Sequence, residues 1–213
     1  MSECNSRSIF GSIEACPGKK NLPGLRRRLY YVPKADVVSF PTLTALPTGS
    51  TSGSQPSMAD LGKLTGNFVL AEGKYFQHID LKDEASNVTY ETVGENGSHL
   101  FNNQANAIVA GQADEVKGFA RQVVDEDITY VYQQRDGKFA VIGNDAFVTH
   151  TAPSGDTAAE ATGASTTTFA INCYDECPVP TYEGTLALSA SAVLNCATGV
   201  IAAPDDDDDE DED

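Results

Sequence analysis

The residues of this sequence that could do chemistry are five cysteines, three histidines and a few clusters of charge. The cysteines are Cys4, Cys16, Cys173, Cys177 and Cys196. The spacing of Cys173 and Cys177 is loosely compatible with zinc, and Cys196 or Cys16 could complete a site. Structural zinc sites usually carry a second close Cys or His pair, and none follows here. We therefore favour ordinary buried thiols and expect no metal, and the odd count argues against a disulfide framework.

No arrangement of residues typical of catalysis is visible. His78, His99 and His150 are scattered, without the spacing of a catalytic triad or of a helical ligand pair. The sequence has no phosphate-binding glycine loop and no G-x-S-x-G elbow. The acidic run 125–127 is typical of a solvated turn rather than a cation site. We expect a protein that is not an enzyme and binds no cofactor, although a hydrolase whose residues converge from distant positions stays open.

The clearest cationic cluster is Arg26-Arg27-Arg28, followed closely by Tyr30. Such residues could contact phosphates and stack on bases. A single short cluster beside a pair of aromatic residues is more often an ion-pair partner for acidic protein neighbours. We therefore expect Arg26, Arg27, Arg28 and Tyr30 to lie at a protein interface.

The charge of the chain is strongly acidic and unevenly distributed. Asp and Glu number 31 against 14 Lys and Arg, which gives a net charge of −17 in 213 residues. Residues 205–213 are all acidic; the rest of the chain carries −8, while residues 1–34 carry +5. An acidic body repels the phosphate backbone, so stable binding of nucleic acid is disfavoured. The acidic end is typical of a solvating tail. Alternatively, it lines a passage for a polyanion or docks on residues 26–28 of a neighbouring copy.

Composition also limits the size of the core and bears on whether the protein enters a membrane. Leu, Ile, Val and Phe number 46 of 213 residues, close to the roughly 20% below which a charged chain struggles to build a core. No stretch approaches the ~20 apolar residues of a membrane helix, and the start lacks the pattern of a signal peptide. We expect a protein that stays in the cytosol where it is made and does not enter a membrane.

The chain divides into an arm, a domain and a tail. Residues 1–24 predict an N-terminal arm, residues 25–203 a domain, and residues 204–213 an acidic tail. The polar segment 42–57 predicts a long loop. A serine cap predicts a short helix over 58–64, and residues 114–121 predict a second one. The remaining pattern predicts an all-β fold, a sandwich or open barrel with one or two short flanking helices.

Strands are predicted from alternating apolar residues between turn signals. Two hairpins are expected, one pairing 67–71 with 75–81 around Gly73 and one pairing 128–134 with 138–143 around Gly137. Further strands are predicted at 29–32, 37–40, 88–93, 107–110, 146–149, 166–173 and 186–194.

Some of these strands are apolar on both faces. In the second hairpin Phe139 and Val141 alternate with Ala140 and Ile142, and side chains alternate across a strand. Either the same chain or another subunit covers the second face, and both explanations stay open. On the second explanation Phe139 and Val141 lie at an interface between copies.

From about Leu25 to Gly184 the order of features resembles the major tail tube protein of tailed bacteriophages, in particular chains from phages of Bacteroidetes-type hosts. The resemblance rests on the segment 24–34, the hairpin 66–81, residues 118–121, the second hairpin through 137–144, and residues 177–184. It is also similar to other β-rich virion structural proteins.

The resemblance implies a β-sandwich with a flanking helix, made in the host bacterial cytoplasm and incorporated into the virion tail. It implies homo-oligomeric rings, six-membered and stacked, beside other virion proteins, through which DNA passes without specific binding. The loop 42–57 would then reach the next ring through Thr48, Gly49, Ser50 and Thr51. The acidic tail is expected on the outer surface or at a rim. Two other functions stay open: a decoration or accessory protein of the capsid, and a small ligand-binding β module.

Overall fold

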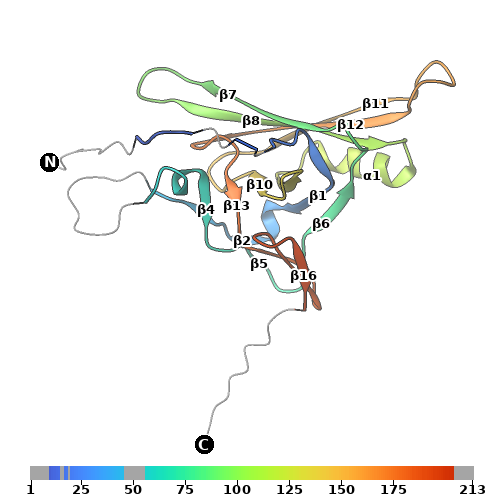
Figure 1. Cartoon of the computed structure of the whole chain (residues 1–213). Coiled ribbons are helices and arrows are strands. Elements are labelled where there is room, and N and C mark those ends of the chain that lie inside the picture. The colour runs from blue at the N-terminus through green and yellow to red at the C-terminus, as the bar shows by residue number, and fades with distance from the viewer. Residues whose placement is uncertain (1–9, 15–16, 19, 46–55, 204–213) are drawn as a thin grey trace, which may run out of the picture.

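The computed structural model describes residues 10–14, 17–18, 20–45 and 56–203. It consists mainly of strands, arranged in layers with a single α-helix on one side (Figure 1). This confirms the all-β sandwich with a short flanking helix that the sequence predicts. Of the described helices, none is both long enough and apolar enough to cross a membrane.

The upper layer in Figure 1 is a four-stranded antiparallel sheet with the order β11-β12-β8-β7. Its strands are β7 (Asn87–Val93), β8 (Leu100–Ala110), β11 (His150–Asp156) and β12 (Thr166–Asp175). β8 and β12 pair over ten residues, from Ala110 opposite Thr166 to Phe101 opposite Asp175. These long central strands set the length of the sheet.

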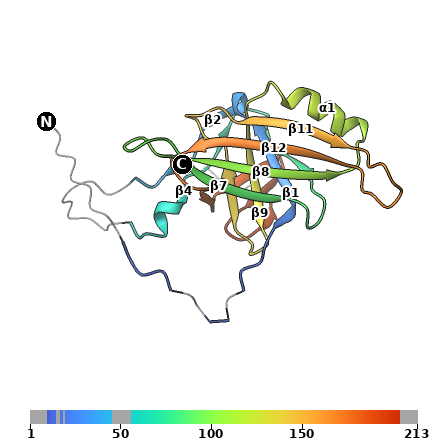
Figure 2. The same cartoon turned by 90° about the horizontal axis from the view of Figure 1, so that it is seen from above.

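The middle layer is a seven-stranded sheet with the order β3-β4-β13-β10-β9-β1-β6. Its strands are β1 (Leu25–Pro33), β3 (Thr42–Leu43), β4 (Lys63–Thr65), β6 (Gln77–Asp80), β9 (Ile128–Gln134), β10 (Phe139–Ile142) and β13 (Thr181–Tyr182). Strands β1 and β9 run beneath the upper sheet and cross its strands at a steep angle (Figure 2), as in orthogonal sheet packing.

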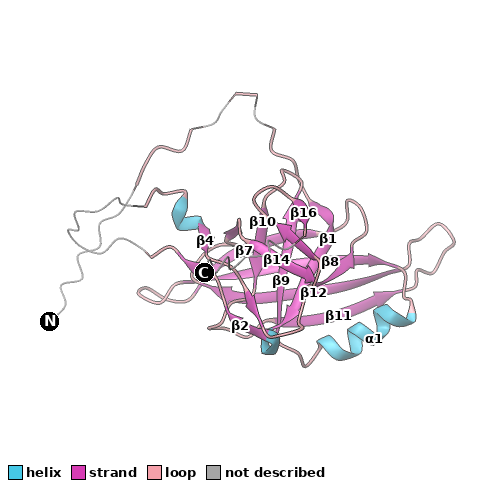
Figure 3. Cartoon of the chain, turned by 90° about the horizontal axis from the view of Figure 1, so that it is seen from below, coloured by secondary structure: helices cyan, strands magenta, loops and turns pink. Residues whose placement is uncertain are grey.

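Two small sheets form the layer on the far side. One contains β14 (Thr185–Ser189), β15 (Ala192–Asn195) and β16 (Val200–Ala202), and the other pairs β2 (Val37–Ser39) with β5 (Val69–Leu70). Two 3₁₀ turns, η1 (Lys34–Asp36) and η2 (Asp60–Gly62), complete the described helical structure together with α1 (Asp114–Val123) (Figure 3).

The middle sheet is buried on both faces by elements of the same chain. Leu29, Tyr130 and Ile142 face the upper sheet and pack with Phe169 and its neighbours. The alternate residues of the same strands face the lower layer and pack with residues such as Leu186 and Leu194. The domain therefore has two apolar cores, one on each side of the middle sheet.

Helix α1 closes one end of the upper core. Phe119 contacts Tyr31 and Phe169, with ring centroids 4.9 and 5.2 Å apart. Asp114 and Glu115 lie in the first turn, where negative charge interacts favourably with the helix dipole. The helix predicted over 114–121 is confirmed and extends to Val123.

Four local predictions are wrong in detail. The segments around Gly73 turn but do not pair, because β5 pairs with β2 and β6 pairs with β1. The helix predicted over 58–64 is reduced to η2, since β4 begins at Lys63 and pairs with β3 and β13. The strand predicted at 146–149 begins instead at His150, and the region 186–194 forms two strands, β14 and β15, rather than one. The hairpin of β9 and β10 around Gly137 is confirmed.

Candidate assembly surface

The upper sheet has one face that no described element covers (Figure 1). Ala105, Ala107 and Phe169 point into the core, so the residues between them point outward. Most of the outward residues are uncharged and polar or small, among them Thr89, Asn102, Gln104, Asn106, Ser154, Thr168, Ala170 and Asn172. An uncovered, polar sheet face is in contact with water or with a partner that retains water at the contact.

Hydrogen bonds between strands order this outward face. Glu91 on β7 accepts from Asn102 Nδ2 at 3.2 Å and from Gln104 Nε2 at 3.0 Å. Every residue of the four strands is described, and none of their outward residues is lysine or arginine, whereas Glu91 and Asp156 carry negative charge. The only basic side chain among these outward residues is the imidazole of His150, so the face offers no ammonium or guanidinium group to a phosphate.

Neither edge of the upper sheet pairs with a further strand within the described structure, although α1 packs beside β11. β11 pairs only with β12, and β7 pairs only with β8. Because each neighbouring pair is antiparallel, β11 and β7 run in opposite directions. Open strand edges present unpaired N–H and C=O groups, which template pairing with another chain. The sheet can therefore be extended at either side by a strand from a second copy.

The arginine cluster lies on an irregular part of β1. The pairing of β1 with β9 shifts register between Leu25 and Leu29, which leaves the three arginines exposed. Arg27 donates to both carboxylate oxygens of Asp83, and this bond lowers the pKa of Asp83. Arg28 Nε lies 3.5 Å from Asp80 Oδ1. Arg26 has no carboxylate at ion-pair distance among the described residues, so two of the three arginines pair within their own chain.

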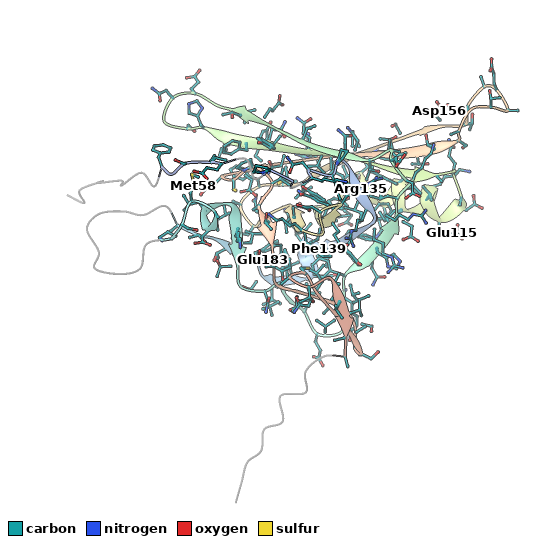
Figure 4. All side chains as sticks on the ribbon, viewed as in Figure 1. Met58, Glu115, Arg135, Phe139, Asp156 and Glu183 are labelled. Carbon is teal, nitrogen blue, oxygen red and sulfur yellow. The ribbon has the colours of Figure 1, made fainter. Side chains whose placement is uncertain are left out.

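Three residues expected at an interface are buried inside the chain. Tyr30 is 5% exposed, Phe139 1% and Val141 2%, and all three belong to the lower core. Their expected interface role is corrected here, because the layer of β14 and β15 covers the face that another subunit was expected to cover. Figure 4 shows Phe139 within the body of the domain, whereas Glu115 and Asp156 lie at its periphery.

Thr48, Gly49, Ser50 and Thr51 lie outside the described residues, as does the acidic run 205–213. Cys4 and Cys16 also lie outside them. The expected contacts of the loop with a second ring therefore stay a prediction.

The three described cysteines are buried, free thiols. Burial raises the pKa of Cys177 to about 11 and that of Cys196 to about 12. Cys173 Sγ contacts the carbonyl of Phe147 at 3.7 Å and the side chain of Asn144 at 3.9 Å. Within the described residues no group of three His, Cys, Asp or Glu side chains is placed to hold a metal ion.

Sequence reasoning missed the amide-bearing residues of the outward face. Asn102, Gln104 and Asn106 alternate with Asn103, Ala105 and Ala107, and this period of two was a sign of a strand. The predicted strand covered only 107–110, because the amides resemble loop residues in composition.

Comparison with known proteins adds no relative: no family model, no curated protein and no solved structure matches this chain.

Proposed function

We propose that this protein is a structural subunit that joins copies of itself edge to edge into closed rings, and that such rings stack into the tail tube of a bacteriophage. The observation that carries the proposal is the upper sheet, which combines two antiparallel edges without a further strand with an uncovered face lacking lysine and arginine. The similarity in the order of sequence features to tail tube proteins supports it.

The directions of the edge strands suit a ring. If each copy is rotated relative to the last about a common axis, β11 of one copy meets β7 of the next. The two strands run in opposite directions, so this contact continues the antiparallel pattern. A contact between two different edges is heterologous and generates a ring when the rotation closes.

The bulk of the domain decides which face lines the ring. The middle and lower layers all lie on one side of the upper sheet (Figure 1). Copies joined through the upper sheets have room for these bulky layers only on the outside of the ring. The uncovered polar face then lines the lumen.

The lumen would accept DNA without holding it. Neighbouring strands lie about 4.8 Å apart, so six copies with four strands each form a wall with a circumference of at least ~115 Å. Tilting the strands increases this circumference. The electrostatic attraction that holds a protein on the phosphate backbone comes from Lys and Arg, and the outward residues of β7, β8, β11 and β12 include neither. The lining suits the passage of a polyanion.

Pro153 in β11 limits the pairing with a neighbour. Proline is tolerated in an edge strand where its nitrogen faces away from the sheet. The β11 edge therefore offers one donor fewer to the β7 strand of a second copy. The contact between copies consequently needs support from other surfaces.

The experiment is to measure the mass of the purified protein by light scattering across a range of concentrations and to image it by negative-stain microscopy. Rings or tubes are expected. A single monomeric species at high protein concentration and physiological salt contradicts the proposal.

Two matched variants test the role of the β7 edge. Successive N–H groups of a strand point to opposite sides, so Thr89→Pro and Tyr90→Pro remove donors from opposite edges of β7. The variant that removes the donor facing β8 weakens the pairing of β7 with β8 and lowers the melting temperature of the domain. The variant that removes the donor facing away from β8 leaves the fold intact and abolishes rings. If rings form from both variants, the edge contact is wrong.

A further inference from the structure

An open apolar pocket lies between α1 and the ends of both main sheets. Its volume is about 210 Å³, and its apolar lining consists of Tyr31, Ile79, Val109, Val116, Phe119 and Phe169. Glu115 and His78 also line it. An engineered protein cavity of about 150 Å³ accepts benzene, so the pocket has room for one large apolar side chain.

The described part of the N-terminal arm carries apolar side chains that the domain does not cover. Phe10 is 91% exposed, Ile13 88% and Leu22 52%. Single exposed apolar residues are common on protein surfaces, but neighbouring ones with almost no contact mark an interaction segment.

The arm and the pocket lie on opposite sides of the domain. Viewed from above, the arm projects beyond β7, while α1 lies beside β11 at the other edge of the upper sheet (Figure 2). Leu22 and Leu25 at the base of the arm line a pocket together with Val88 of β7, so the arm leaves the domain at the β7 edge. When this edge meets the β11 edge of the next copy, the base of the arm faces the α1 side of that copy.

We propose that residues 10–14 of one copy dock on the α1 surface of the adjacent copy, with Phe10 or Ile13 entering the pocket. This inference rests on the proposed ring. The docked arm supplies an additional contact between copies, which is needed because Pro153 leaves the joined edges with one donor fewer.

The length and charge of the arm fit this docking. Fifteen residues separate Phe10 from Leu25 and span at most about 50 Å, compared with a radius of gyration of about 17 Å for a domain of this size. Lys20 on the arm and Glu115 at the pocket have no ion-pair partner among the described residues. Their opposite charges favour the approach of the arm to α1.

The test uses disulfide formation between two different chains. In a Cys4→Ser/Cys16→Ser background, one chain carries Ile13→Cys and the other Glu115→Cys. After mixing and mild oxidation, a covalent pair of the two chains is expected on a non-reducing gel. The matched control replaces Glu115→Cys by Ala190→Cys, an exposed position in the turn between β14 and β15, and gives no pair above background.

A second measurement separates the arm contact from folding. Phe10→Ser/Ile13→Ser changes only exposed side chains, so the melting temperature of the monomer stays that of the wild type. The protein concentration at which rings appear rises by about tenfold or more, because the burial of an apolar side chain is lost at each contact.

The outcomes distinguish this inference from the proposed function. Rings without a cross-link above the Ala190→Cys control overturn the arm docking and leave the ring intact. A specific cross-link without rings supports the docking and contradicts the tail tube proposal. If neither rings nor cross-links form, both are wrong.

Discussion

The side chain of Lys34 is mostly covered by the protein, and a single carboxylate pairs with its ammonium group. Its side chain is 11% exposed, its Nζ lies 2.8 Å from Asp127 Oδ1, and it also donates to the carbonyl of Phe147. Asp127 Oδ1 also accepts from the Thr149 amide at 2.9 Å. Asp127→Ala leaves a mostly covered ammonium group without its counter-charge, so we expect the free energy of unfolding to fall by about 2 kcal/mol, between the losses for exposed and for buried ion pairs. Urea denaturation below the assembly concentration measures it.

The matched control for this prediction is Asp36→Ala. Lys74 Nζ lies 2.9 Å from Asp36 Oδ1, but the Lys74 side chain is 50% exposed, and exposed ion pairs contribute up to about 1 kcal/mol. Equal losses in the two variants would show that burial of Lys34 does not matter.

The buried thiols predict a dependence of reactivity and stability on pH. The ordinary thiol pKa of about 9 is raised to about 11 in Cys177 and about 12 in Cys196. At pH 8 the thiolate fraction is therefore lower by about 100-fold and about 1000-fold. Both cysteines are expected to react with iodoacetamide at least that much more slowly in the folded protein than in urea, as followed by mass spectrometry of the peptides.

The same shifts set the direction of the stability change. A thiol whose folded pKa is raised binds its proton more tightly in the folded state, so folding is favoured below pH 9 and loses this contribution as pH rises toward 11 and 12. Cys196→Ala should make the fall in stability above pH 9 shallower. An unchanged fall would assign it to other groups, such as the buried tyrosines whose pKa values are also raised.

At the scale of single elements, α1 contains a glycine that lowers the stability of the helix. Gly118 lies in the middle of the helix, is exposed, and has open space where a Cβ would be. Glycine in a helix interior costs roughly 0.5–1 kcal/mol relative to alanine, so Gly118→Ala should increase the free energy of unfolding by this amount. Gly137→Ala is the control: Gly137 has φ +101° in the β9–β10 turn, and alanine there is expected to destabilise the protein. A destabilised Gly118→Ala variant would contradict the prediction.

Elements defined by nearby residues could be predicted from the sequence. The β9–β10 hairpin and α1 depend on a glycine turn, alternation and helical periodicity within a short stretch. The pairing of β5 with β2 and of β6 with β1 could not be predicted, because the partners lie about thirty to fifty residues away. A turn at Gly73 is compatible with either arrangement. Tertiary packing decides between them.

The two-sided strands show the same limit at the candidate site. Alternation in 139–142 correctly indicated that both faces are buried, but it could not identify the partner. The structure assigns the cover of Phe139 and Val141 to the same chain. The uncovered surface lies instead on the upper sheet, where the polar residues of β8 and β12 face outward. By composition alone these residues could not be distinguished from a loop.

At the scale of the whole molecule, layers and charge are arranged asymmetrically. The two apolar cores stabilise a domain whose thick side is away from the upper sheet. The thin side presents mainly amides and hydroxyls, with two acids and the imidazole of His150. A wedge of this kind joined through its thin side forms a ring with an uncharged to acidic lumen. The proposed function therefore depends on the absence of lysine and arginine from one face, which can be altered without touching either core.

Asn106→Lys/Asn172→Lys places two cations per copy on the proposed lumen wall, where both residues are exposed. Rings should still form, because neither side chain is part of a core or of an edge strand. Linear DNA should now remain with the sedimented rings at low salt and be released as salt is raised, since counterion release makes phosphate binding steeply salt-dependent. Asn106→Asp/Asn172→Asp is the control, and it should retain as little DNA as the wild type. If the wild type retains DNA as strongly as the lysine variant, the polar face does not line a passage for a polyanion.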